Sequence, residues 1–219
     1  MSTVAARLVQ AVMVALAAPE FDALLRREAP LGRIDDIERV HPESHVQAIL
    51  DSIPEEGLRR IDADTAVCPG SGEAALRAVG AVISAVDAVM TDEADNAFCA
   101  VRPPGHHAER ASAMGFCLYN NVALGVEQAL SHDDVERVAV LDFDVHHGNG
   151  TVDIFKDRPE VLICSSFQHP FYPYRYYDIQ RPNIVNTPLP AGTTGEQFRQ
   201  AVERDWLPAL QQHQPQLIF

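Results

Sequence analysis

The stretch that decides the fold of this chain is Val138-Ala-Val-Leu-Asp-Phe-Asp-Val-His-His-Gly148. Its first four residues are all apolar, which is typical of a strand buried on both faces of a parallel sheet. Two carboxylates and two imidazoles then follow within six residues, where the strand is expected to end. Ligands of open α/β sheets bind at the carboxyl ends of strands, so this strand end is the first candidate site.

The spacing of these polar residues favours a metal ion. Alternation along a strand places Asp142, Asp144 and His146 on one side. Asp144 and His146 can therefore point at the same ion, and a carboxylate oxygen with an imidazole nitrogen suits zinc at roughly 2.0–2.2 Å. The alternative is a polar strand end followed by a His-Gly turn. Four titratable groups beside a buried strand are costly without a partner, which favours the ligand site.

Length and composition point to one α/β domain. The chain has 219 residues, 47% of them hydrophobic, and no composition break divides it, so we expect a single domain over residues 1–219. Apolar strand patterns alternate with helical ones, which predicts a three-layer α/β/α fold with a mainly parallel sheet. The four cysteines form no Cys-x-x-Cys pair, which indicates free thiols in a reducing, cytoplasmic compartment.

The charge balance restricts the partners. A net charge of −14 disfavours direct nucleic-acid binding and binding to an anionic membrane, and mildly favours a cationic substrate. No apolar run approaches the roughly 18–20 residues that span a bilayer. The sequence leaves open whether the chain forms a homo-oligomer.

Periodicity and turn residues predict the order of elements. We expect helices over residues 3–28 with a break at Pro19, 41–50, 72–90, 120–130, 150–155 and 195–212. We expect strands over residues 97–101, 137–141, 161–165, 183–186 and 216–219. Since the last of these strands starts at the final residues, we expect the native protein to continue and the domain to be incomplete here.

A second polar constellation follows the strand expected at residues 97–101. It reads Arg102-Pro-Pro-Gly-His-His-Ala108, and its two imidazoles are candidate general acid/base groups because histidine titrates near neutral pH. Loops after neighbouring parallel strands meet in one crevice. We therefore expect His106 and His107 to share a site with Asp142 and Asp144.

Three sequence blocks together resemble one family. They are Arg102-Pro-Pro-Gly-His-His-Ala108, Gly115-Phe-Cys-Leu-Tyr-Asn-Asn121 and Asp142-Phe-Asp-Val-His-His-Gly-Asn-Gly-Thr151. They look like the blocks of the zinc-dependent histone deacetylase family, closest to its class II-like and bacterial branch, which includes acetylpolyamine amidohydrolases. The resemblance covers roughly residues 20–219, in the family's order, and implies the arginase–deacetylase fold.

The resemblance implies a role for each matching residue. Asp144 and His146 match two of the family's three zinc ligands. His107 matches the general base that activates water, and His106 matches its mainly electrostatic partner. Asp142 matches the carboxylate that orients His106.

The resemblance also implies a substrate channel and a second ion. Phe116 and Tyr172 match the aromatic walls of a narrow channel, and Gly115 would leave room for the methylene stem of the substrate. Ser165 and Ser166, with nearby backbone carbonyls, match a monovalent cation site that usually holds K⁺.

The chain also departs from the family pattern. The family's third zinc ligand, an aspartate, and a later tyrosine would both lie beyond Phe219. We therefore expect the 219 residues alone to be inactive or weakly active. The loop at residues 174–181 lacks the glycines common in the family, which predicts a different channel rim and substrate preference.

These observations leave three functional hypotheses. The first is a zinc-dependent hydrolase that removes acetyl groups from N-acetylated amines, with acetyl-lysine or acetylpolyamine as substrate. The second is an inactive remnant that binds an acylated ligand or a protein partner. The third is a manganese ureohydrolase of the same fold, which the order Asp-x-Asp-x-His-His disfavours, because those enzymes use Asp-x-His-x-Asp.

Overall fold

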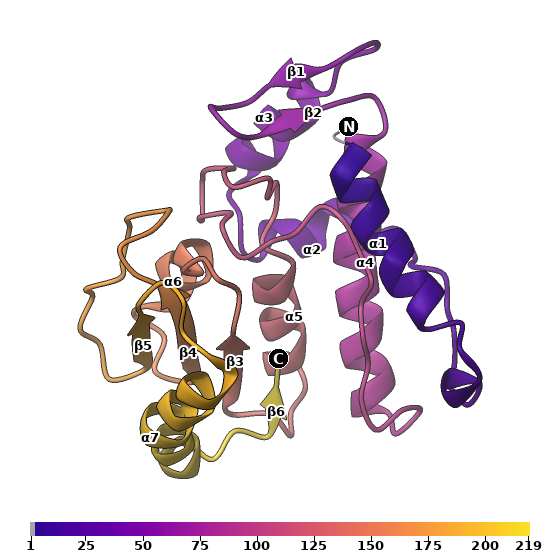
Figure 1. Cartoon of the computed structure of the whole chain (residues 1–219). Coiled ribbons are helices and arrows are strands. Elements are labelled where there is room, and N and C mark those ends of the chain that lie inside the picture. The colour runs from indigo at the N-terminus through magenta and orange to yellow at the C-terminus, as the bar shows by residue number, and fades with distance from the viewer. Residues whose placement is uncertain (1–2) are drawn as a thin grey trace.

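A computed structural model describes residues 3–219 of the chain. Its centre is a four-stranded sheet in the order β5-β4-β3-β6, with all neighbouring strands parallel (Figure 1). The strands are β3 (Val138–Asp142), β4 (Val161–Gln168), β5 (Ile184–Leu189) and β6 (Leu217–Ile218). The strand that the sequence analysis placed at residues 137–141 is thus confirmed as an inner strand of the sheet.

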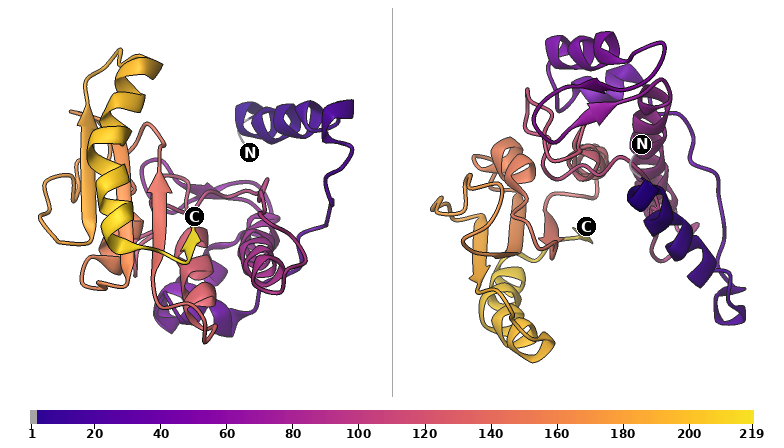
Figure 2. Two further views of the ribbon diagram at one scale, coloured as in Figure 1. Left: turned by 90° about the horizontal axis from the view of Figure 1, so that it is seen from below. Right: turned by 45° about the horizontal axis from the view of Figure 1, so that its top comes forward.

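Helices cover both faces of this sheet. On one face lie α4 (Ser71–Met90) and α5 (Asn121–Leu130), and on the other lies α7 (Gly195–His213) (Figure 2). Alternation along β3 separates two apolar clusters, because Val138 and Val140 pack with the α4–α5 side while Ala139 packs with Trp206 of α7. The expected three-layer α/β/α fold with a parallel sheet is confirmed.

The remaining elements lie before β3 and after it. They are α1 (Thr3–Ala15), the short 3₁₀ helix η1 (Pro19–Phe21), α2 (Ile34–Glu38), α3 (Glu43–Ser52), the antiparallel pair β1 (Arg59–Arg60) and β2 (Ala66–Val67), and α6 (Asn149–Phe155). No helix within residues 3–219 combines the length and apolarity needed to cross a bilayer. All four cysteines are free thiols, as expected.

Two predicted elements differ most from the structure, whereas the others are shifted by a few residues at their ends. The helix expected to reach residue 28 ends at Ala15, because Leu24 and Leu25 are exposed and no core contact stabilises a helix there. The strand expected at residues 97–101 does not form, since this half-buried segment hydrogen-bonds to no neighbouring strand and Phe98 is 74% exposed. An apolar run is a strand only where another strand pairs with it.

One amide anchors the edge strand β5 to the connection between α6 and β4. The Nδ2 group of Asn183 donates to the carbonyl oxygens of Phe155, Arg158 and Val161 at 2.9, 3.0 and 3.0 Å. Asn183 itself is buried. The carbonyl oxygens of Phe155 and Arg158 also accept the backbone N–H groups of Arg158 and Val161 at 3.0 Å, so the Asn183 amide adds a second hydrogen bond to each of them.

Replacing this amide is expected to destabilise the fold. N183A removes the only donor on the Asn183 side chain and with it three hydrogen bonds to backbone carbonyls, and each such bond typically contributes about 0.5–1.5 kcal/mol. Urea denaturation of the chain measures the free energy of unfolding. Q180A is the matched control, because the Gln180 amide makes an exposed hydrogen bond to Asp178 in the same loop. An equal effect of the two substitutions would contradict the anchoring role.

Candidate active site

The site is built at the carboxyl end of β3, where a loop from residues 102–108 meets the turn after the strand. The Nδ1 atom of His106 lies 2.9 Å from Oδ2 of Asp142, and both side chains are largely buried. Burial alone would lower the pKa of His106, but the hydrogen bond to Asp142 and its charge outweigh burial and raise it. Burial likewise opposes ionisation of Asp142, yet its pKa is lowered because His106 pairs with it.

The neighbouring imidazole has the opposite electrostatic character. The ring of His107 lies 4.0 Å from that of His106, centroid to centroid, and its Nδ1 atom lies 2.7 Å from Oδ1 of Asn149. Burial, and then the charge of His106, lower the pKa of His107 to about 4, although the hydrogen bond with Asn149 opposes this. At neutral pH the site therefore holds an imidazole that favours the proton beside one that is uncharged.

The two candidate zinc ligands lie next to this pair. Oδ1 of Asp144 accepts from the backbone N–H of His146 at 2.7 Å and lies 3.0 Å from its Nδ1 atom. The rings of His107 and His146 are 5.7 Å apart. The oxygen and nitrogen donors suit zinc, but catalytic zinc sites have three protein ligands. No cluster of three or more His, Cys, Asp or Glu residues arranged to hold a metal occurs within residues 3–219.

Aromatic rings from the segment after β4 pack over these imidazoles. The ring of Tyr172 lies 5.2 Å from His107 and 5.8 Å from His146, edge to face, and Phe171 stacks on His146 at 5.2 Å. Burial, together with the Asp64 carboxylate, raises the pKa of the Tyr172 phenol, which stays neutral at physiological pH. Tyr172 thus lies against the rings of both His107 and His146.

The other two channel candidates lie in a tight turn beside His107. Gly115 and Phe116 both have positive φ, at 55° and 67°. A Cβ atom on Gly115 would overlap the His107 ring, so this position needs glycine in order to pack against the imidazole. The Phe116 side chain is 61% exposed and makes no ring contact with the His cluster.

The potassium candidates lie on the neighbouring strand. Ser165 is paired in register with Asp142, and Ser165 and Ser166 are both buried. The Ser165 hydroxyl has no hydrogen-bond partner. A buried hydroxyl without a partner is uncommon in proteins, and an ion beside it would satisfy it.

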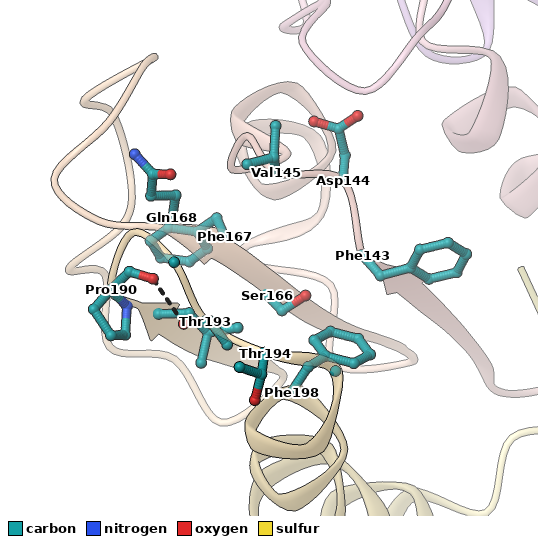
Figure 3. A pocket seen from close by; sticks show the side chains of 13 residues that line it. Phe143, Asp144, Val145, Ser166, Phe167, Gln168, Pro190, Thr193, Thr194 and Phe198 are labelled. Atoms are coloured by element: carbon teal, nitrogen blue, oxygen red, sulfur yellow. Dashed lines mark hydrogen bonds between the residues drawn. The ribbon is translucent and has the colours of Figure 1, made fainter.

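Two cavities flank the turn that carries Asp144. The larger, about 870 Å³, is lined by His106, Asp142 and Asp144 together with apolar residues of α4, α5 and β6. The smaller, about 280 Å³, lies between this turn, the end of β4 and the N-terminus of α7 (Figure 3). Figure 3 shows Phe143, Asp144 and Val145 along one side of it and Ser166 and Phe198 along the other. Asp144 lines both cavities.

Several residues of the site were missed by the sequence analysis. Asn149 belongs to one of the quoted blocks, but only the structure shows that it contacts His107. Glu109 and Arg175 extend this contact towards the surface. His147, by contrast, is buried outside this contact, with Nε2 3.1 Å from Oδ1 of Asn186. The sequence feature that could have identified Asn149 as a site residue is its position directly after the His-His-Gly motif.

A parallel sheet with paired histidines and aspartates at the carboxyl end of its inner strand defines the arginase–deacetylase class of α/β proteins. Within that class, the profile of the histone deacetylase domain matches residues 3–219. The chain belongs to the histone deacetylase family. The resemblance stated from the three sequence blocks is thus confirmed.

Individual relatives agree with this family. The chain is 41% identical over 199 residues to the histone deacetylase-like amidohydrolase of Pseudomonas aeruginosa, covering 88% of this chain and 52% of that protein. It is 37% identical over 205 residues to a probable deacetylase of Archaeoglobus fulgidus, covering 91% of this chain and 56% of that protein. The chain therefore spans about half the length of the curated relatives it matches.

A solved structure of a related domain has the same fold as this chain. The crystal structure of the HDA15 HD domain superimposes with a TM-score of 0.89 at 30% identity, covering 96% of this chain and 63% of that chain. The arginase–deacetylase type of fold is therefore shown by the structure as well as by the sequence.

The opposite behaviour of the imidazoles predicts how stability depends on pH. The pKa of His107 is about 4 in the folded chain against an ordinary value of 6.5, so the unfolded chain binds this proton first as the pH falls. The free energy of unfolding should therefore decrease between pH 6.5 and about 4. Chemical denaturation across this range should show a smaller decrease for H107Q than for the unchanged chain.

H132Q serves as the control for that measurement, because His132 is a half-buried imidazole outside the site. The unchanged chain and H132Q should show the same slope. A slope that stays the same in H107Q would mean that His107 does not enter the folded state uncharged.

Proposed function

We propose that this chain carries the acid/base half of a zinc-dependent hydrolase that removes acetyl groups from N-acetylated amines. The proposal depends on two neighbouring imidazoles: His106, paired with Asp142 at 2.9 Å, lies beside an uncharged His107. The candidate zinc ligands Asp144 and His146 lie next to this pair. Membership of the histone deacetylase family supports the same reaction class.

The metal would be held by Asp144 and His146, which are two of the three protein ligands that a catalytic zinc requires. Zinc, when bound, supplies a Lewis acid that polarises the amide carbonyl and activates water. The unpaired Ser165 hydroxyl beside Asp142 supports a K⁺ site with Ser166 on the adjacent strand. Such an ion would neutralise charge near Asp142 and hold the turn after β3 in place.

Each imidazole would have its own part in the proton transfers. His107 holds its Nδ1 hydrogen towards Asn149, so its Nε2 lone pair is free to take a proton from the attacking water. His106 favours the protonated form because Asp142 pairs with it, and it would stabilise negative charge on the reacting amide. A protonated imidazole then returns a proton to the leaving amine, which gives acetate and a primary amine.

The substrate class follows from the walls of the site and from the charge of the chain. Tyr172 packs against both His107 and His146, and with Phe116 would form the walls for an acetylated methylene chain next to Gly115. The net charge of −14 favours a cationic substrate, such as a lysine-rich acetylated peptide or an acetylated polyamine.

A second candidate function rests on the partial ligand set. Asp144 and His146 are the two candidate zinc ligands, and no three-ligand cluster is found within residues 3–219. A protein that keeps the cavity but lacks a third ligand would bind an acylated ligand or a protein partner without hydrolysing it. Metal analysis of the protein expressed from its complete gene separates the two functions.

The general-base role predicts the phenotype of one substitution. H107A in the protein expressed from its complete gene should lower kcat for an acetyl-lysine peptide or an acetylpolyamine by about 10²–10⁴-fold, because a positioned base contributes a factor of this size. Zinc content, measured by mass spectrometry of metals, should not change. Full activity in H107A would rule out the base assignment, and H132Q provides a control for general effects of losing an imidazole.

The ligand assignment is tested independently of activity. One zinc ion per chain is expected in the complete gene product, against two manganese ions for a ureohydrolase. D144N should lose stoichiometric zinc, since a neutral amide oxygen is a poorer ligand than a carboxylate. D153N is the matched control, because Asp153 pairs with Lys156 outside the ligand set. Zinc retained at full stoichiometry in D144N would remove Asp144 from the ligands.

A further inference from the structure

A continuous chain of hydrogen bonds links the surface of the site to the candidate base. One guanidinium nitrogen of Arg175 lies 2.8 and 2.7 Å from the two carboxylate oxygens of Glu109. Oε1 of Glu109 accepts from Nδ2 of Asn149 at 2.8 Å. Oδ1 of Asn149 lies 2.7 Å from Nδ1 of His107. Four side chains from three separate segments therefore connect the loop before β5 to His107.

The donors and acceptors in this chain leave one arrangement. Arginine only donates and an ionised carboxylate only accepts, so Glu109 must receive hydrogen bonds from both sides. The amide of Asn149 must then turn its NH₂ group to Glu109 and its oxygen to His107. An amide oxygen only accepts, so His107 must carry its hydrogen on Nδ1. The lone pair of the neutral ring is thereby confined to Nε2.

We propose that Glu109, held by Arg175, is a positioning residue that sets the tautomer of His107. The inference rests on the proposed function, in which Nε2 of His107 is the basic atom. A carboxylate at residue 109 determines which way the Asn149 amide faces, and this in turn determines which nitrogen of His107 can accept a proton. With a neutral amide at residue 109, only the longer contact of the Asn149 NH₂ group with the His107 carbonyl at 3.4 Å still favours this orientation, and the opposite orientation becomes accessible.

Arg175 is needed because Glu109 is only 8% exposed. An ionised carboxylate at that burial requires a cationic partner, and Arg175 supplies it.

The backbone on both sides of Arg175 has positive φ although no glycine stands there: Tyr174 and Tyr176 have φ values of 60° and 56°. The Tyr176 hydroxyl donates to Asp153 at 2.9 Å, which holds this loop against α6.

The same loop therefore has two contacts with the proposed machinery. It begins near Tyr172, whose ring packs on His107, and it contributes Arg175 to the chain that ends at His107. This is the segment, free of glycine, in which the sequence analysis expected a channel rim different from that of the family. The departure thus places an arginine where it orients the base through two intervening side chains.

Nuclear magnetic resonance tests the proposal without any catalytic measurement. Long-range ¹H–¹⁵N spectra of the 219-residue chain at pH 7, with no zinc added, report which nitrogen of His107 carries hydrogen. The unchanged chain should show the Nδ1–H form alone. E109Q should show a mixture of both tautomers, and R175A should shift in the same direction. A pure Nδ1–H form in E109Q would overturn the proposal.

R181A is the matched control for R175A. Arg181 lies in the same loop and pairs with Asp157 at 3.2 Å, but both side chains are exposed and neither contacts the chain to His107. R181A should leave the His107 spectrum unchanged. An equal response of R175A and R181A would show a general effect of the loop and would contradict the specific role of Arg175.

A rescue variant separates positioning from mere stability. In N149D the side chain accepts from His107 through either oxygen, so it needs no orientation by residue 109. At a pH high enough to keep the His107 ring neutral beside the added carboxylate, the double variant N149D/E109Q should therefore recover the single Nδ1–H tautomer that E109Q loses. A tautomer mixture in the double variant would contradict the proposal, because it would mean that E109Q acts through disruption of the fold.

Activity provides the second readout. In the protein expressed from its complete gene, E109Q should lower kcat about 10- to 100-fold with little change in KM, which is the usual effect of removing a partner behind a catalytic group. Loss of the tautomer in E109Q together with unchanged kcat would uphold the positioning role but contradict His107 as the base. An unaltered tautomer would contradict the positioning role whatever the activity.

Discussion

The hydrogen bond between His106 and Asp142 is the interaction on which the rest of the site depends. It joins a loop that belongs to no strand to the end of β3, and the two segments must approach closely for it to form. A Cβ atom on Gly148 would overlap Asp142, and one on Gly150 would overlap the backbone of Ala108. The backbone N–H of Gly150 donates to the His106 carbonyl at 2.9 Å, so both glycines permit the docking of the loop.

The docking produces two adjacent histidines with opposite protonation preferences. Both are removed from water, which by itself disfavours the charged form of each. His106 has a carboxylate as its partner and stays basic. His107 has a neutral amide as its partner, and the charge of His106 disfavours its protonation. Pairs of like groups with separated pKa values are the general way in which one site provides both an acid and a base.

Much of this protein was predictable because its strongest signals are local. The apolar run of β3, the helical periodicity of α4 and α7, and the polar residues at the strand end each depend on a short stretch of chain. Ser165 and Asp142 lie side by side because β3 and β4 are parallel, which the alternation of strands and helices predicted. The segment at residues 97–101 shows where prediction from local sequence fails, because its apolar run resembles a strand but no neighbouring strand pairs with it.

The sequence by itself determined the family, the order of the main helices and strands, and the grouping of His106, His107, Asp142, Asp144 and His146. The family and the order of elements follow from motifs whose residues lie within a few positions of each other, and the grouping joins two such motifs that lie 36 positions apart. Only the tertiary structure decided that Asn149, Glu109 and Arg175 form one chain to His107, and that Ser165 has an unpaired hydroxyl. The reason is physical: such contacts join residues up to 66 positions apart, and which side chains meet is settled by packing rather than by local pattern.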